Sequence, residues 1–292
     1  MRIDAHHHLW NYSPEEYDWI DVRMQALRRD FLPADLEREL KLADVQATIA
    51  VQARQTLEET SWLLDIAAGN KFIQGVVGWA PIAEKDFPET LDALQQKIKF
   101  KGLRHVVQGE ANGFLDSAEF NRGIEAMRDT SLVYDLLIFA RQLAEATRFV
   151  SRHPNQIFVL DHIAKPDIAR DQFTAWDTEI RKLGSHENVF CKLSGMVTEA
   201  NWHCWSSEGL RPYFETVLET FGPSRLMVGS DWPVLTVACS YKYWWETVES
   251  WIGHLSPSER NEIQGGVAGR VYRINSDEQS VNAGESSKSG AP

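Results

Sequence analysis

The chain is organised around a stretch near its start, Arg2-Ile3-Asp4-Ala5-His6-His7-His8-Leu9-Trp10. Read as a β-strand, its two-residue period places Asp4, His6 and His8 on one face. The intervening His7 then points to the other face. Two imidazoles on one face can hold a small electrophile or a metal ion between them. A purification tag fits poorly because the residues Ile-Asp-Ala precede the histidines, and histidine is rarely doubled on one face merely to fill a core.

Composition limits the class of protein. The chain has 292 residues, of which 43% are hydrophobic and 25% charged, as expected for a globular protein with a full core. Its formal net charge of -12 argues against nucleic acid and anionic membranes as partners. We find no apolar run of about 18 residues and no apolar export signal. The sparse cysteines Cys191, Cys204 and Cys239 lack CxxC spacing, which indicates reduced thiols. We therefore expect a cytoplasmic protein.

Short apolar runs recur along the chain, and each is followed by an amphipathic segment. Strands are predicted over residues 2–8, 45–52, 72–79, 102–107, 132–139, 156–162, 188–194 and 225–231. Their nearly continuous apolar character is typical of strands buried on both faces. Helices are predicted from residue 33 and over residues 56–68, 88–98, 117–128, 141–151, 173–183, 210–220, 241–252 and 257–264.

Strands that alternate with helices indicate parallel βαβ units. Eight such units predict an α/β protein with a single-domain (β/α)8 TIM barrel over residues 1–274. An open doubly wound sheet is the alternative, but the Gly-rich phosphate turn expected after its first strand is absent. Residues 275–292 are polar and poor in aromatics, which predicts a mobile C-terminal tail.

Barrels of this type carry their chemistry at the carboxyl ends of the strands. Polar and ionisable residues gather there in this sequence, and we place His6, His8, His162 and Asp231 at the centre. Imidazole and carboxylate groups suit zinc or a similar divalent ion with one bound water. Without a metal, Asp231 can take a proton from water while a histidine polarises a carbonyl oxygen. The residues alone leave both versions open.

Several longer motifs at the predicted strand ends accompany the HxH pair. They are IDAHHHLW (3–10), VVGWAPI (76–82), KGLRHVVQ (101–108), YDLLIFARQL (134–143), FVLDHIAKP (158–166), KLSGMVTEA (192–200) and RLMVGSDWPV (225–234). Through these motifs the chain resembles the amidohydrolase superfamily, in the branch that hydrolyses lactones. HxH alone is a weak signal, but its combination with Asp-His, Lys-Leu-Ser-Gly and Gly-Ser-Asp-Trp-Pro is specific. The resemblance spans residues 1 to about 274.

The resemblance implies roles for particular residues. His6 and His8 match the HxH pair, His162 matches the strand-six histidine, and Asp231 matches the general base. Arg104 and His105 match a pair that faces the substrate, and Tyr134, Ser194 and Trp202 match positions in the substrate pocket. Gln52, Arg54, Lys192 and Trp232 are expected to bind substrate because they lie at the predicted strand ends.

Metal-rich relatives carry a histidine on strand five, whereas this chain offers Tyr134 and Asp135 there. A binuclear centre is therefore not expected. A single divalent ion, zinc first, would be held by His6, His8, His162 and Asp231, with Glu110 as a weaker candidate ligand. A metal-free site is an equal alternative.

The expected substrate is a small, neutral, polyhydroxylated lactone, such as L-fucono- or L-rhamnonolactone, which would be hydrolysed to its sugar acid. The 11 tryptophans offer flat apolar faces for a sugar ring. A dicarboxylate lactone would need several arginines, and only Arg54 and Arg104 lie near the strand ends. A metal-dependent decarboxylase, another acyl hydrolase and a non-catalytic sugar-binding barrel remain alternatives. The sequence does not indicate the oligomeric state.

Overall fold

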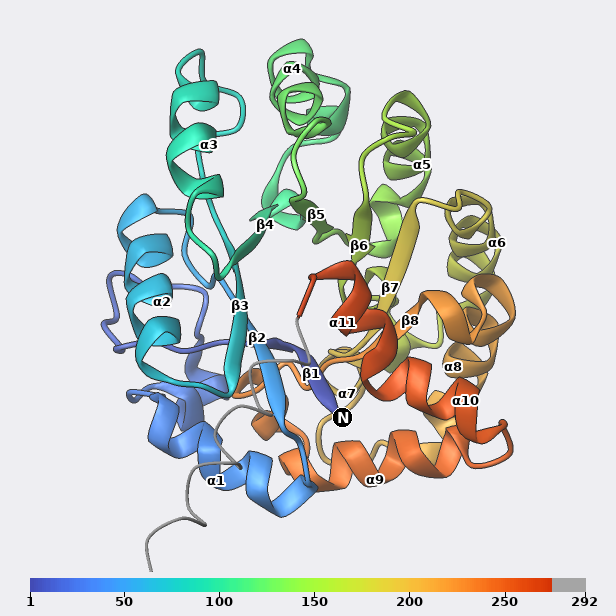
Figure 1. Ribbon diagram of the computed structural model, residues 1–292. Coiled ribbons are helices and arrows are strands. Elements are labelled where there is room, and N and C mark those ends of the chain that lie inside the picture. Colours follow the sequence, from blue (N-terminus) through green and yellow to red (C-terminus); the bar gives the residue numbers. More distant parts are fainter. Residues whose placement is uncertain (275–292) are drawn as a thin grey trace, which may run out of the picture.

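Eight parallel strands form one sheet in which each strand pairs with the next along the chain. The computed structural model describes residues 1–274 (Figure 1). The strands are β1 Ile3–His7, β2 Ala47–Val51, β3 Ile73–Gly78, β4 Phe100–His105, β5 Val133–Leu136, β6 Phe158–Leu160, β7 Val189–Leu193 and β8 Leu226–Val228. Each lies within or close to a predicted strand. The predicted tail, residues 275–292, lies outside the described residues.

The helices surround the strands, as Figure 1 shows. They are α1 Pro33–Ala43, α2 Leu57–Gly69, α3 Phe87–Gln95, α4 Ala118–Met127, α5 Leu143–Arg152, α6 Phe173–Gly184, α7 Met196–Glu199, α8 Ser207–Phe221, α9 Tyr241–Ile252, α10 Pro257–Asn261 and α11 Val267–Val271. The short helices α7 and α11 were not predicted, since neither is long enough to show a period in the sequence. Among residues 1–274, no helix has the length and apolarity needed to cross a membrane.

Contacts just beyond β8 join the last strand to the first. The Asp231 amide donates to the carbonyl of His6 (2.8 Å), and the His8 amide donates to that of Trp232 (2.6 Å). A parallel bridge also pairs His7 with Trp232. These contacts close the sheet, and the predicted single-domain TIM barrel is confirmed.

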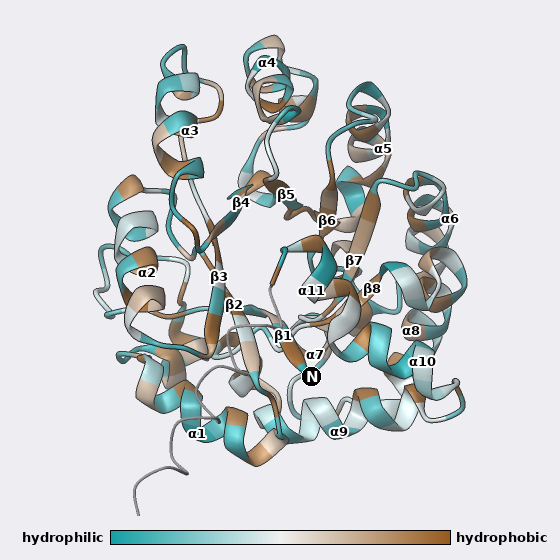
Figure 2. Ribbon diagram, in the orientation of Figure 1, coloured by the Kyte–Doolittle hydropathy of each residue, from teal (hydrophilic) through white to brown (hydrophobic). Residues whose placement is uncertain are grey.

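Two apolar layers hold the barrel together. The larger lies between strands and helices and buries tryptophans such as Trp176, Trp244 and Trp251. The smaller combines strand residues such as Ile49 and Val77 with residues of α11, so α11 covers one end of the barrel. Figure 2 shows hydrophobic residues concentrated on the strands, and hydrophilic residues on the outer turns of the helices.

The alternation of side chains in β1 is interrupted. Its pairing register with β2 shifts between Asp4 and His7. His6 and His8 still face each other, whereas the Asp4 carboxylate accepts hydrogen bonds from Ser230 and from Tyr241 of α9. The prediction that Asp4 shares a face with the two histidines was therefore wrong. A bulge changes the side of the strand to which the following side chains point, and a strict two-residue period does not predict that change.

Candidate active site

A cavity of about 590 Å3 opens at the carboxyl ends of the strands. Its walls come from the loops that follow β1, β2, β4, β5, β6 and β8. The central residues that line it are His8, His162 and Asp231, and the outer wall includes Glu16, Trp19, Arg54, Gln55, Arg104, Gln108 and Lys165. This is the position at which TIM-barrel enzymes carry out catalysis.

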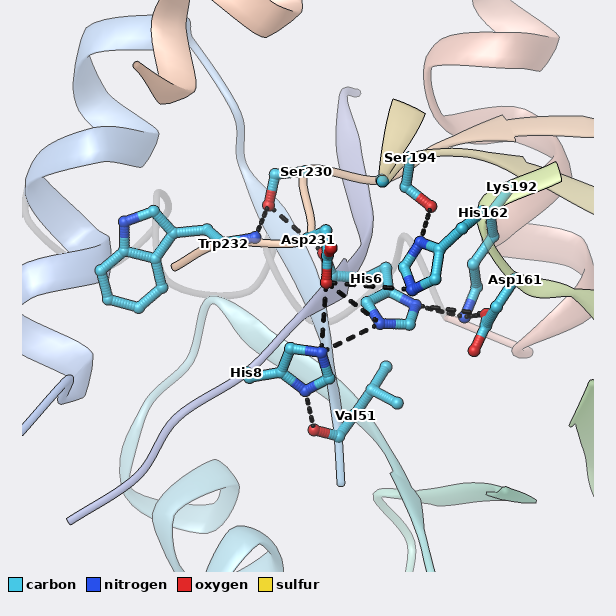
Figure 3. Close-up of polar contacts among 12 residues, drawn as sticks. His6, His8, Val51, Asp161, His162, Lys192, Ser194, Ser230, Asp231 and Trp232 are labelled. Atoms are coloured by element: carbon cyan, nitrogen blue, oxygen red, sulfur yellow. Dashed lines mark hydrogen bonds and ion pairs between the residues drawn. The ribbon is translucent and has the colours of Figure 1, made fainter. Parts of the chain in front are cut away.

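Three imidazoles converge on one carboxylate (Figure 3). Oδ1 of Asp231 lies 3.3 Å from Nε2 of His8, 3.8 Å from Nε2 of His6 and 3.9 Å from Nε2 of His162. Nε2 of His6 in β1 and Nε2 of His8, directly after β1, are themselves 3.2 Å apart. All four side chains are buried. The structure thus brings together the four residues that the sequence places at the centre.

The other nitrogen of each ring has its own partner, which fixes the ring orientation. Nδ1 of His8 lies 2.8 Å from the carbonyl oxygen of Val51, and Nδ1 of His162 lies 2.8 Å from Oγ of Ser194. Nδ1 of His6 lies 3.2 Å from Asp161. In all three rings, Nε2 is therefore directed to Asp231.

Unusual backbone conformations orient the side chains of His162 and Asp231. His162 through Lys165 adopt left-handed φ values of 53°, 49°, 63° and 45°, and Asp231 has a φ of 59°. Such conformations are disfavoured outside glycine and persist where the surrounding structure holds them. Gly195 is required beside this turn, because a Cβ there would meet the His162 ring at 2.6 Å.

A network of buried charges lies beneath the histidines. Nζ of Lys192 contacts Oδ2 of Asp135, and lies 3.0 Å from Oδ1 of Asp161 and 3.2 Å from Nδ1 of His6. Arg104 donates to the other Asp161 oxygen at 3.0 Å. The Tyr272 hydroxyl donates to Asp135 at 2.9 Å. Two cations therefore balance two carboxylates, which is the condition for burying charge.

Burial sets the protonation of the central residues. It lowers the pKa of His6 well below its usual value, against the opposing charge of Asp161. It also lowers the pKa of His162 to about 4. For Asp231, burial favours the neutral form, but His162 and His8 outweigh it and hold the pKa below that of an ordinary carboxyl group. At neutral pH, Asp231 is therefore a carboxylate beside uncharged His6 and His162 rings.

This donor set fits a divalent cation. A carbonyl can only accept, so Nδ1 of His8 carries a hydrogen, and in the neutral ring Nε2 then presents a lone pair to Asp231. His6 presents its own Nε2 lone pair when its Nδ1 donates to Asp161. Acceptors that face each other this closely repel unless a proton or a cation lies between them. The ligand atoms of His6, His8 and Asp231 all lie within 4.8 Å of one another, and their types suit zinc.

Some of the predicted substrate-binding residues support the cluster. Arg104 and Lys192 belong to the charge network, and Ser194 holds His162. Gln52 is buried and contacts Arg104, accepting from the guanidinium through its backbone carbonyl. Arg54 lines the outer wall of the cavity and pairs with Glu16 at 2.9 Å.

The structure does not bring the other predicted residues to the cavity. His105 bonds Glu110 at 2.8 Å and stacks on Phe114, so neither His105 nor Glu110 joins the histidine cluster. Adjacent strand residues point to opposite faces, and here Arg104 takes the inward position.

Tyr134 also lies away from the cavity. It packs among Phe120, Phe149 and Phe158 under the helices, while Asp135 faces the interior. Trp232 packs on Phe31 and points away from Asp231 (Figure 3). Trp202 donates to the carbonyl oxygen of Thr198 and does not line the cavity.

The predicted site residues did not include several residues of the cavity wall, among them Glu16, Trp19, Gln55, Gln108 and Lys165. Gln108 and Lys165 lie within motifs quoted above, so spacing from a strand end could have identified them. Trp19 belongs to the long loop between β1 and α1. No period or motif marks that loop as part of the site.

Comparison with known proteins places the chain in a family. A family model described as amidohydrolase matches residues 3–274. L-fucono-1,5-lactonase of Burkholderia multivorans is 39% identical over 290 residues, covering 94% of this chain and 96% of the relative. A protein of the same name from Burkholderia ambifaria is 38% identical over 281 residues, with the same shares covered. The chain therefore belongs to the amidohydrolase family, as its motifs indicated, and is a hydrolase.

A solved structure agrees with this assignment. The crystal structure of an amidohydrolase from Burkholderia multivorans with bound zinc superposes with a TM-score of 0.91 at 39% identity. The match covers 94% of this chain and 100% of that one.

The buried charge network yields a prediction on stability. Replacing Lys192 by Met leaves Asp135 and Asp161 short of a cation, so we expect the free energy of unfolding to fall by about 3–5 kcal/mol. Lys182→Met is the matched control, because Lys182 forms an ion pair with Glu179 on the exposed surface. It should change stability by less than about 1 kcal/mol. Urea denaturation measures both. A loss for Lys192→Met no larger than that of the control would contradict the network.

Proposed function

We propose that this hydrolase opens a sugar-derived lactone, such as L-fucono-1,5-lactone, to the corresponding sugar acid. The observation that carries the proposal is the convergence of His6, His8 and His162 on the Asp231 carboxylate at the floor of a cavity. The similarity to L-fucono-1,5-lactonases supports the substrate class.

Asp231 is suited to act as the general base. Its pKa lies below that of an ordinary carboxyl group, so at neutral pH it is ionised and has a free oxygen to accept a proton. A water molecule in the cavity beside Oδ1 would lose a proton to it while attacking the lactone carbonyl. Collapse of the tetrahedral intermediate breaks the ring C–O bond, and the ring oxygen recovers that proton from Asp231. Water is thus added across the ester bond with no covalent enzyme intermediate.

Two versions of this mechanism use the same residues and differ in what polarises the carbonyl. In the metal-free version, the His162 imidazole, with its hydrogen on Nε2, and the nearby cations would stabilise the developing oxyanion. In the other, His6, His8 and Asp231 would hold one divalent ion, and their donor types suit zinc. A bound ion of this kind would polarise the carbonyl oxygen and lower the pKa of water.

The charges around the cavity favour a neutral substrate. Within residues 1–274, each lysine or arginine that lines the cavity already has a carboxylate partner. Arg54 pairs with Glu16, Arg104 with Asp161, and Lys165 with Glu199 at 3.7 Å. A dicarboxylate substrate would have to displace these partners. A polyhydroxylated lactone needs only hydrogen bonds and an apolar surface, which Trp19 provides at the rim.

The base assignment predicts a large loss of turnover. Asp231→Asn keeps the shape of the side chain and removes its basicity, so kcat should fall by about 10²- to 10⁴-fold. Asp129→Asn, on the exposed surface, is the control and should leave kcat unchanged. Proton release from L-fucono-1,5-lactone measures both, with thermal melting to show that each variant folds. Near-full activity of folded Asp231→Asn would refute the assignment.

A lactone panel tests the function itself. Untreated, chelator-stripped and zinc-resupplied enzyme would each be assayed with L-fucono-1,5-lactone, an L-rhamnonolactone and 2-pyrone-4,6-dicarboxylate. We expect hydrolysis of a sugar lactone well above that of the dicarboxylate. Activity lost on stripping and restored by zinc selects the metal version, whereas unchanged activity selects the metal-free one. Failure of every lactone in all three states would overturn the proposal.

A further inference from the structure

The outer wall of the cavity contains polar side chains whose hydrogen bonds are largely satisfied within the protein. Arg54 and Lys165 have carboxylate partners. Oε1 of Gln55 accepts from the backbone amide of Val106 at 2.8 Å. These groups maintain the shape of the wall, and a ligand would have to break an existing contact to use them fully.

Two buried atoms on this wall differ from the rest. Oε1 of Gln108 and Nε of Arg104 have no hydrogen-bond partner among residues 1–274. Both residues line the cavity, one on β4 and the other in the short turn Val107–Gly109 that follows it. Buried polar atoms are nearly always paired, so an unpaired acceptor beside a cavity calls for a donor that comes from outside the chain.

The backbone of Gln108 is held on both sides, so the residue cannot easily move to find a partner. Its amide donates to the carbonyl oxygen of Leu137 at 3.0 Å, and its own carbonyl accepts from Arg141 at 3.0 Å. Only the side chain is free to adjust, and the terminal torsion of a glutamine rotates broadly. The amide oxygen can therefore turn into the cavity from a fixed anchor.

We propose that Gln108 is a specificity-determining residue that accepts a hydrogen bond from one ring hydroxyl of the substrate. The inference rests on the proposed lactone hydrolysis and narrows it to hydroxylated lactones. A hydroxyl group can both donate and accept, so the hydroxyls of a sugar lactone can pair with the unpaired acceptor at Gln108 and with the unpaired donor at Arg104. A lactone without that hydroxyl leaves the acceptor unpaired, and a site of this kind discriminates strongly against such an analogue.

Gln108 is the better residue to test. Arg104 also binds Asp161 and Gln52, so its replacement would disturb the charge network beneath the histidines. Gln108→Leu removes the acceptor at nearly constant size, and Gln108→Glu keeps it. Gln95→Leu, on the exposed surface of α3, is the matched control.

The experiment measures kcat and KM of wild type and the three variants with L-fucono-1,5-lactone, its single-deoxy analogues and unsubstituted δ-valerolactone. We expect Gln108→Leu to lower kcat/KM for L-fucono-1,5-lactone by about 10- to 100-fold. It should have little effect on the one deoxy analogue that lacks the recognised hydroxyl, or on δ-valerolactone. Gln108→Glu should retain the preference for the hydroxylated lactone, and Gln95→Leu should match wild type.

The outcomes separate this inference from the function on which it rests. If Gln108→Leu lowers kcat/KM equally for all lactones, the residue only supports the fold. If it lowers kcat/KM for none of them, the residue does not contact the substrate. Either result overturns the inference and leaves lactone hydrolysis standing. Should Gln108→Leu fail to fold, loss of the hydroxyl preference by Gln108→Ala supports the proposal and its retention refutes it. If the wild type hydrolyses none of the lactones, both the role of Gln108 and the proposed lactone hydrolysis are overturned.

Discussion

The site depends on the junction between the first and last strands. Asp4 accepts hydrogen bonds from the amide and hydroxyl of Ser230 and from Tyr241, and so ties β1, the loop after β8 and α9 together. The backbone bonds from Asp231 to His6 and from His8 to Trp232 then fix two histidines opposite one carboxylate. The contacts that complete the barrel are therefore the same contacts that assemble the candidate catalytic group.

Electrostatics explains why this group can be reactive and still be buried. Lys192 and Arg104 compensate Asp135 and Asp161 beneath the histidines, whereas burial keeps His6 and His162 uncharged. Among residues 1–274, the ion-pair contacts of Asp231 are with histidines only, and no lysine or arginine touches its carboxylate. A substrate carbonyl with its water, or a divalent ion, would supply the positive or proton-bearing partner that this arrangement lacks.

Much of this arrangement could be predicted from the sequence, because apolar periodicity identifies strands and barrel topology collects their carboxyl ends. That reasoning located His6, His8, His162 and Asp231. It failed where the facing of a side chain depends on local irregularity. The bulge in β1 turns Asp4 away from the face that carries His6 and His8. On β4 and β5, the side chains of Arg104 and Asp135 point into the barrel, so His105 and Tyr134 point away from the cavity. It could not find Trp19, because tertiary packing alone brings that loop to the cavity.

The pH dependence of kcat/KM tests the central claim most directly, that an ionised Asp231 works beside uncharged His6 and His162 rings. Burial lowers the pKa of His162 from 6.5 to about 4, so this ring stays neutral as the pH falls, until about pH 4. The pKa of Asp231 lies below its ordinary value, so the base also survives mild acid. We predict that kcat/KM for L-fucono-1,5-lactone is constant from about pH 7 to about pH 5 and declines only near pH 4. A decline centred near 6.5, the value of an exposed imidazole, would contradict the account.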